Sequence, residues 1–128
     1  MGRIPILTTL IVILVLATGG LILIPNKVIN GKIGNSGASH IVNYDADQGY
    51  TPSEIKIKKG DTVVFKNNSD KYFWPASDIH PTHGIYPEFD PQDAVPPGDS
   101  WTFRFNKQGT WRFHDHLSPY YTGRIIVE

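Results

Sequence analysis

Two pairs of histidines are the residues of this sequence best suited to chemistry. His114 and His116 flank an aspartate in "WRFHDHLSPYYTG" (residues 111–123), and His80 and His83 form the motif "HPTH". The pattern around the first pair is strand-like, and side chains at i and i+2 of a strand share a face, about 6–7 Å apart at the backbone. The two imidazoles would therefore project together, and such a pair can converge on one metal ion or on two adjacent ions.

Each pair alone has a simpler explanation. One histidine of the strand pair could pack in the core while the other lies at the surface, and the loop pair could be solvated. However, four of the five histidines fall into these two pairs, and the chain contains no cysteine. Neutral imidazole suits Cu, Zn, Ni or Fe. The pattern predicts one metal site with four ligands: His80, His83, His114 and His116. The fifth histidine, His40, stands alone, and we expect it at the surface or in packing.

Several carboxylates could orient such ligands by accepting a hydrogen bond from the second ring nitrogen of a histidine. The candidates are Asp78, Glu88, Asp90, Asp93 and Asp115. Asp115 is the preferred one, although the alternation of a strand places it on the face opposite the histidine pair. We expect the other four to be solvated loop charges or turn formers.

Short strands are the elements that must position these residues. "HIVNYD" (40–45), alternating residues 54–58 and 62–66, and "GRIIVE" (123–128) are typical of strands. Residues 100–113 read as a hairpin that turns at Gly109, and no segment after residue 38 has a helical period. Several short strands separated by turns predict an antiparallel sandwich or barrel.

The stretch between residues 67 and 100 has little regular pattern, and loops this long in a small domain are usually functional or disordered. It carries aromatic residues that disordered segments seldom contain. We therefore expect an ordered loop, folded over the end of the sandwich, with room for a short helix. Trp74, Phe89 and Trp101 are expected to pack around the loop histidines, whereas Tyr120 and Tyr121 are expected to serve in packing.

The apolar N-terminal region indicates that the rest of the chain is exported across a membrane. Residues 4–24 contain no charge and follow Arg3, and roughly 20 apolar residues span a bilayer as a helix. We prefer an uncleaved anchor; the alternative is a signal cleaved near Ala17-Thr18-Gly19, but the apolar run continues past that point. The predicted organisation is an anchor or signal segment at 1–25, a linker at 26–38 and a folded domain at 39–128.

Charge and cysteine content exclude several classes of protein. Lys plus Arg and Asp plus Glu both number 12, and nucleic-acid-binding proteins normally carry a basic excess, so no nucleic-acid partner is expected. The absence of cysteine rules out disulfides, thiolate metal sites and a cysteine nucleophile.

Two segments resemble the cupredoxin domain: "IKIKKGDTVVFKNNS", and "PPGDSWTFRFNKQGTWRFHDH" with the later "GRIIV". The resemblance covers residues 50 to 128, and "GTWRFHDH" followed by "TGRIIV" is its most specific part. It implies an all-β, Greek-key β-sandwich that binds copper at one end, here preceded by one N-terminal transmembrane helix.

The chain departs from the blue-copper pattern within that family. Small blue copper proteins place a cysteine six residues after the glycine of the final hairpin, where this chain has Asp115, and its only methionine is Met1. A blue copper–thiolate centre is therefore excluded. "GTWRFHDH" is instead similar to the His-x-His motif of multicopper oxidase domains, which implies that His114 and His116 are copper ligands. The loop histidines do not match the oxidase spacing, and one domain with four candidate histidines cannot form the oxidase trinuclear cluster alone.

The function expected from these features is that of a copper protein at the cell membrane, single-pass, with its domain on the extracytoplasmic side. An all-histidine, thiolate-free site would serve copper binding, sequestration, delivery or redox transfer, with a redox or copper-handling protein as partner. Three alternatives stay open: a small copper oxidoreductase acting on a small molecule such as dioxygen, superoxide or nitrite, a metal-free interaction module, and an accessory unit of a larger membrane complex. Whether the chain is an enzyme is left open.

Overall fold

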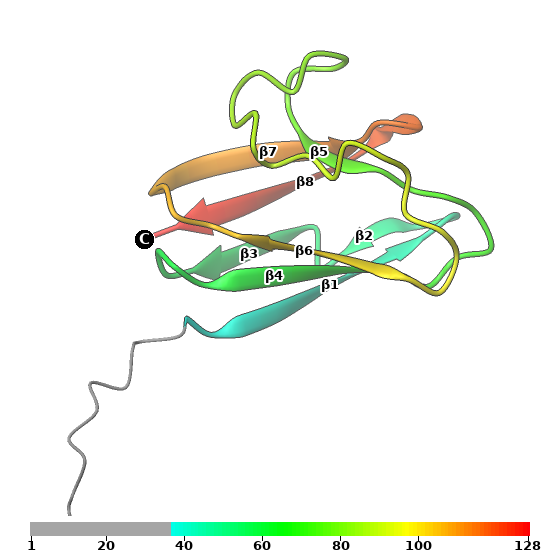
Figure 1. The fold of residues 1–128 in the computed structure, drawn as a ribbon. Coiled ribbons are helices and arrows are strands. Elements are labelled where there is room, and N and C mark those ends of the chain that lie inside the picture. The colour runs from blue at the N-terminus through cyan, green and yellow to red at the C-terminus, as the bar shows by residue number, and fades with distance from the viewer. Residues whose placement is uncertain (1–36) are drawn as a thin grey trace, which may run out of the picture. The chain divides into compact units, whose positions relative to one another are not determined.

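Eight strands form two four-stranded sheets in the computed structural model, which describes residues 37–128 (Figure 1). One sheet has the order β2-β1-β4-β6, with β1 at Ser39–Asp45, β2 at Gly49–Thr51, β4 at Thr62–Asn67 and β6 at Ser100–Arg104. The other has the order β3-β8-β7-β5, with β3 at Glu54–Ile57, β8 at Ser118–Val127, β7 at Gly109–Asp115 and β5 at Pro75–Ser77. Residues 37–128 contain no helix, so the predicted all-β sandwich is confirmed.

Two details of the predicted topology are wrong. The sheets are mixed rather than antiparallel, because β1 pairs with β4 and β3 pairs with β8 in parallel. Residues 100–113 also do not form a hairpin, since β6 pairs with β4 and β7 pairs with β8. The connection crosses between the sheets: fully buried Phe105 enters the core, and its backbone N–H donates to the Asp61 carbonyl at 2.9 Å. Alternating aromatic residues suit a hairpin and such a crossing equally well.

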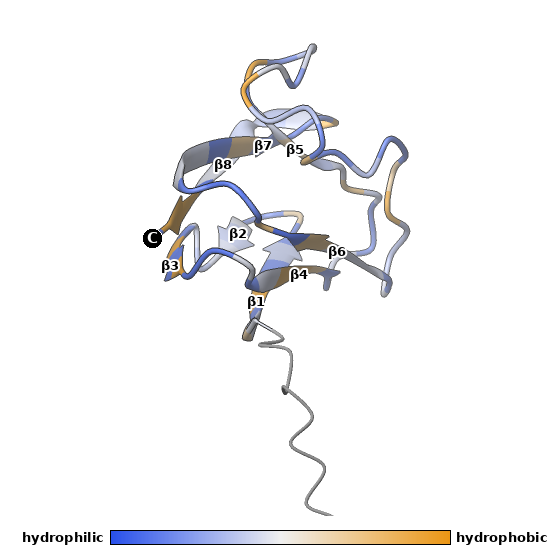
Figure 2. Ribbon diagram, turned by 60° about the vertical axis from the view of Figure 1, so that its left-hand side comes forward, coloured by the Kyte–Doolittle hydropathy of each residue, from blue (hydrophilic) through white to orange (hydrophobic). Residues whose placement is uncertain are grey.

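The core between the sheets is largely aromatic. Five phenylalanines are 0% exposed: Phe65, Phe73, Phe89, Phe105 and Phe113. Phe89 comes from the long loop, and its ring stacks on Phe103 with centroids 5.2 Å apart. Aromatic pairs of this kind add about 0.5–1.5 kcal/mol beyond the burial of their surface. Figure 2 shows that apolar segments occur within this loop as well as along the strands.

The loop between β5 and β6 is ordered, as expected, but contains no short helix. The Ser77 N–H donates to the Phe89 carbonyl at 2.9 Å, and Phe73 forms a bridge with Val95 across the base of the segment. In Figure 1 its first part rises above β5 and β7, outside the sheet that contains them. Hydrogen bonds and a buried aromatic residue therefore hold this loop against the sheet that carries the C-terminal histidine pair.

Within residues 37–128 there is no helix of the length and apolarity needed to cross a membrane. The predicted span at residues 4–24 lies outside the described part of the chain.

Candidate metal centre

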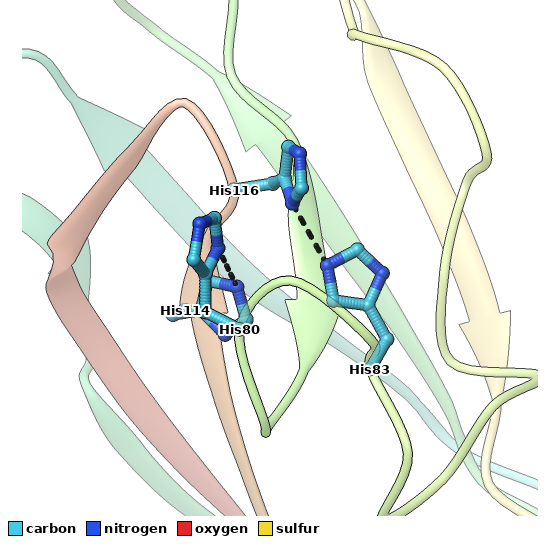
Figure 3. A group of neighbouring side chains, drawn as sticks. All are labelled: His80, His83, His114 and His116. Atoms are coloured by element: carbon cyan, nitrogen blue, oxygen red, sulfur yellow. Dashed lines mark hydrogen bonds between the residues drawn. The ribbon is translucent and has the colours of Figure 1, made fainter.

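The four predicted ligands lie together (Figure 3). His80, His83, His114 and His116 each offer a ring nitrogen, and these four nitrogens lie within 4.8 Å of one another. The Nδ1 of His80 is 3.2 Å from the Nε2 of His114, and the Nε2 of His83 is 2.9 Å from the Nδ1 of His116. Nitrogen atoms at such separations can share one metal ion after small rotations of their rings.

The sandwich places the C-terminal pair at one end of β7. His114 lies in β7 opposite Ala76 of β5, and the β7–β8 register shifts between His114 and Asp115. His116 lies one residue beyond the end of β7, where its N–H donates to the Trp74 carbonyl at 2.8 Å. Both imidazoles still reach the same side, as the i, i+2 spacing predicts.

The loop positions His83 through a constrained backbone. Its φ is 54°, in the left-handed region that non-glycine residues rarely adopt. The His83 N–H donates to the Ile79 carbonyl at 2.6 Å, and its carbonyl accepts from the Ser77 hydroxyl at 2.7 Å. Such conformations cost of order 1–3 kcal/mol and are concentrated at functional sites.

Two carboxylates orient two of the rings. The Nδ1 of His83 is 2.6 Å from Asp90 Oδ2, and the Nδ1 of His114 is 3.0 Å from Asp78 Oδ1. An ionised carboxylate only accepts hydrogen bonds, so Nδ1–H of each ring is the donor and Nε2 carries the lone pair that faces the cluster. This is the partner arrangement that fixes metal-binding histidines and increases their basicity.

The charge state of the cluster favours the binding of a cation, because one carboxylate is ionised and the pKa values of two histidines are lowered. Burial acts to raise the pKa of Asp90, but hydrogen bonds from His83, the Gln92 N–H and the Trp74 indole lower it overall, so this carboxylate is ionised at neutral pH. Burial lowers the pKa of His114 and of His116. Asp78 acts against this at His114, but the charges of the neighbouring histidines lower both values further, and the net shift of each is downward. Neutral imidazole is the form that binds metal.

The centre is closed on one side and open on the other. His114 and His83 are 2% and 5% exposed, whereas His80 is exposed and His116 is half-buried. Exposed Ile79 and Leu117 lie next to His80 and His116 in the sequence. The solvent-facing side of the cluster is therefore formed by His80 and His116.

The preferred carboxylate, Asp115, was the wrong choice among the candidates. It is fully buried and accepts hydrogen bonds from the Tyr44 hydroxyl at 2.9 Å and the Trp74 N–H at 2.8 Å, on the face of β7 opposite His114. Glu88 pairs with Lys107, and Asp93 accepts from the N–H of its neighbour Ala94. Asp78 and Asp90, expected to be solvated, are the two that contact histidines.

Only one of the three aromatic residues expected near the loop histidines lies there. The Trp74 ring packs on His116 with centroids 4.7 Å apart, and its indole N–H donates to Asp90 Oδ1 at 2.7 Å. Phe89 and Trp101 instead stack on each other in the core. Of the two tyrosines that follow the histidine pair, Tyr121 packs against the core and donates to the Ala46 carbonyl, but Tyr120 is 75% exposed.

His40 has no contact with the cluster. Its Nε2 lies 2.9 Å from Asp61 Oδ2. His40 is half-buried and packs against Asp61, in keeping with the surface or packing role expected of it.

A family model described as a cupredoxin-like domain matches residues 10–127. The chain belongs to this family. Its fold is similar to that of a purple cupredoxin from Nitrosopumilus maritimus, at a TM-score of 0.56 and 16% identity over 70% of this chain and 99% of the other. It is similar also to a reduced Cu(I) form of an amicyanin mutant, at a TM-score of 0.58 and 20% identity over 70% and 82% of the two chains. No curated protein sequence matches this chain.

The cupredoxin-like domain has a donor set suited to copper. The cluster offers four imidazole nitrogens and no thiolate, a donor set that suits divalent ions of the Cu or Zn type. His114 lies on the face of β7 opposite Asp115, and His80 and His83 reach it from the loop that follows β5. The centre is therefore built on the outer side of this strand by the long loop.

Proposed function

We propose that this cupredoxin-like domain binds one copper ion through His80, His83, His114 and His116. The observation that carries the proposal is the gathering of the four ring nitrogens within 4.8 Å. Two carboxylates that hold the rings of His83 and His114 add support, because metal-binding histidines usually donate their second ring N–H to such a partner.

Copper is the preferred metal for two reasons. Imidazole sites for divalent first-row ions bind Cu²⁺ most strongly, and the similar amicyanin structure is a Cu(I) form by its description. Ligation by imidazole without thiolate favours Cu(II) over Cu(I), so storage or delivery of copper suits the site better than fast electron transfer. Bound copper would supply one-electron redox chemistry or act as stored cargo.

The residues around the four histidines would have separate roles in binding the ion. Asp78 and Asp90 fix the rings of His114 and His83, while the packed indole of Trp74 limits water on one side of His116. His80 lies exposed at the rim, where an ion or a partner could approach. A redox or copper-handling protein would dock there, against exposed Ile79 and Leu117.

We propose further that the domain acts on the extracytoplasmic side of the cell membrane as a single-pass protein. The uncharged residues 4–24 support this, since their length suits a membrane-spanning helix. Residues 1–25 would be the anchor, 26–38 the linker and 39–128 the copper-binding domain.

A second candidate is a small copper oxidoreductase. The exposed side of the centre at His80 favours it, because a small molecule could reach a metal held there. Turnover of dioxygen, superoxide or nitrite by the loaded protein, lost in His114→Ala, would support this activity over storage.

Metal analysis of the purified chain tests the copper proposal. We expect one copper per chain, an electron paramagnetic resonance signal of Cu(II) with nitrogen ligands, and no intense blue absorption. Each of the four His→Ala variants should weaken copper binding, whereas His40→Ala, a matched change outside the cluster, should not. Unchanged copper binding in all four variants would overturn the proposal.

A further inference from the structure

A groove lies at the end of the sandwich opposite the histidines. It has a volume of about 690 Å³, and its lining includes Lys56, Lys58, Lys59 and Arg104. Strands β3 and β6 end at this groove, β4 begins there, and β7 ends at the histidines, so the two sites occupy opposite ends of the strands. Nothing in the proposed copper chemistry uses this region.

The groove carries an excess of positive charge, although the whole chain is neutral. Four cationic side chains line it, against the carboxylates of Asp61 and Glu128. Asp61 is already engaged, because it accepts hydrogen bonds from the Ala38 and Lys58 N–H groups and pairs with His40. Glu128 lies 3.9 Å from Lys56. Within residues 37–128, no carboxylate pairs with Lys58, Lys59 or Arg104.

These cations are exposed and available to an external anion. All four side chains are exposed to solvent: Lys56, Lys58, Lys59 and Arg104. Arg104 is held in place by donating from Nε to the Gly60 carbonyl at 3.0 Å, which keeps its guanidinium at the rim of the groove. Guanidinium and ammonium groups arranged in this way are suited to phosphate oxygens.

The N-terminal segment joins the domain at this groove. Gly37 and Ala38 are part of its lining, and Ala38 donates to Asp61 Oδ1 at 2.8 Å before β1 begins at Ser39. The apolar residues 4–24 are thus separated from the groove by a linker of about a dozen residues. If residues 4–24 enter a bilayer, a linker of that length would keep the basic end within reach of its surface.

We propose that this basic end docks on the phosphate headgroups of anionic lipids. The proposal rests on the membrane anchor of the proposed function, but not on copper. Basic residues beside a membrane-spanning segment each contribute about fivefold to attraction by an anionic bilayer. Docking at this end would direct the histidine cluster, at the other end of the strands, away from the membrane and towards soluble partners.

The test places the full chain in lipid nanodiscs in which some lipids carry a nitroxide label on the headgroup. Nuclear magnetic resonance then measures how strongly the nitroxide broadens each backbone amide signal. In discs with phosphatidylglycerol we expect strong broadening at Lys58, Lys59 and Arg104 and little at His114. The double variant Lys58→Gln/Lys59→Gln should lower the docked-to-undocked ratio about thirtyfold, which matches two lost charges. The broadening should also fall with added salt, as expected for surface charges.

A matched control is Lys66→Gln/Lys71→Gln, which removes two exposed lysines located away from the groove. The amide signals of this variant should be broadened to the same extent as those of the unmodified chain. Equal broadening in neutral phosphatidylcholine discs, or in the Lys58/Lys59 double variant, would overturn the docking. A chain that does not enter the discs would instead contradict the anchor, and copper binding would be unaffected by either result.

Discussion

His114 and Asp115 are neighbours in β7 but serve opposite sides of the strand. The Nε2 of His114 lies 3.2 Å from His80 Nδ1 in the cluster, while Asp115 Oδ2 accepts from the Tyr44 hydroxyl of β1 in the other sheet. Successive side chains of a strand point to opposite faces, so one His-Asp-His motif supplies both a pair that faces the histidine cluster and a buried clamp, the Asp115 carboxylate that accepts hydrogen bonds inside the core. The clamp also accepts from the Trp74 N–H, and the Trp74 carbonyl accepts from the His116 N–H.

Asp90→Asn should weaken copper binding by about 10–100-fold, the usual effect of losing a carboxylate that orients a metal-binding histidine. The reason is that Asp90 holds His83 Nδ1 at 2.6 Å and Trp74 Nε1 at 2.7 Å. Competition with a chelator of known affinity measures the change.

Asp93→Asn is the matched control for that experiment, because Asp93 is exposed and bonds only the N–H of Ala94 among the described residues. Its copper affinity should equal that of the unmodified chain. Equal affinities in Asp90→Asn and Asp93→Asn would show that Asp90 has no part in holding the metal.

Asp115→Ala should destabilise the fold by about 2–4 kcal/mol, because it leaves the buried Tyr44 hydroxyl and Trp74 N–H without an acceptor. Asp115→Asn, which keeps one acceptor oxygen, should cost less. Denaturant unfolding of the metal-free protein measures both values. If the Ala variant is as stable as the unmodified chain, the buried clamp is not a stabilising element.

Gly123→Ala should also destabilise the fold, by about 1–3 kcal/mol through overpacking. A Cβ at residue 123 would lie 2.3 Å from the Phe113 ring and 2.8 Å from the Ser53 carbonyl oxygen. At Gly84 the nearest atom would be 3.6 Å away, so Gly84→Ala is the control. Thermal unfolding should separate the two variants, and equal midpoints would contradict the close packing at residue 123.

Acid should weaken the fold partly through Asp61. The hydrogen bond with His40, then those from the Lys58 and Ala38 N–H groups, lower its pKa below the ordinary 3.8. The unfolded chain therefore takes up this proton at a higher pH than the folded chain does. The stabilising contribution is present above about pH 4 and is lost as the pH falls through the folded pKa.

In Asp61→Asn, the free energy of unfolding should therefore decline less between about pH 5 and pH 2 than in the unmodified chain. Asp99→Asn, an exposed change elsewhere, should keep the original slope. Parallel slopes in Asp61→Asn and the unmodified chain would contradict this role for Asp61.

The histidine cluster could be predicted from the sequence because the spacing of the histidines and the lack of cysteine both point to it. The i, i+2 spacing places His114 and His116 on one side of a strand, and the lack of cysteine points to imidazole donors. The sequence could not predict that β6 pairs with β4 while β7 pairs with β8, because alternating aromatic residues suit a strand in either sheet. The roles of Asp78 and Asp90 depend on how the loop folds back, which the sequence pattern does not encode; closeness in sequence favoured Asp115, although strand alternation already argued against it.

Pulsed electron paramagnetic resonance of the chain loaded with one equivalent of Cu(II) tests the central claim most directly. With histidines labelled with ¹⁵N, we predict hyperfine couplings from imidazole nitrogens of both pairs on a single copper ion, reduced in His80→Ala and in His114→Ala alike. Couplings from one pair only, unchanged when the other pair is replaced, would contradict a shared four-histidine centre.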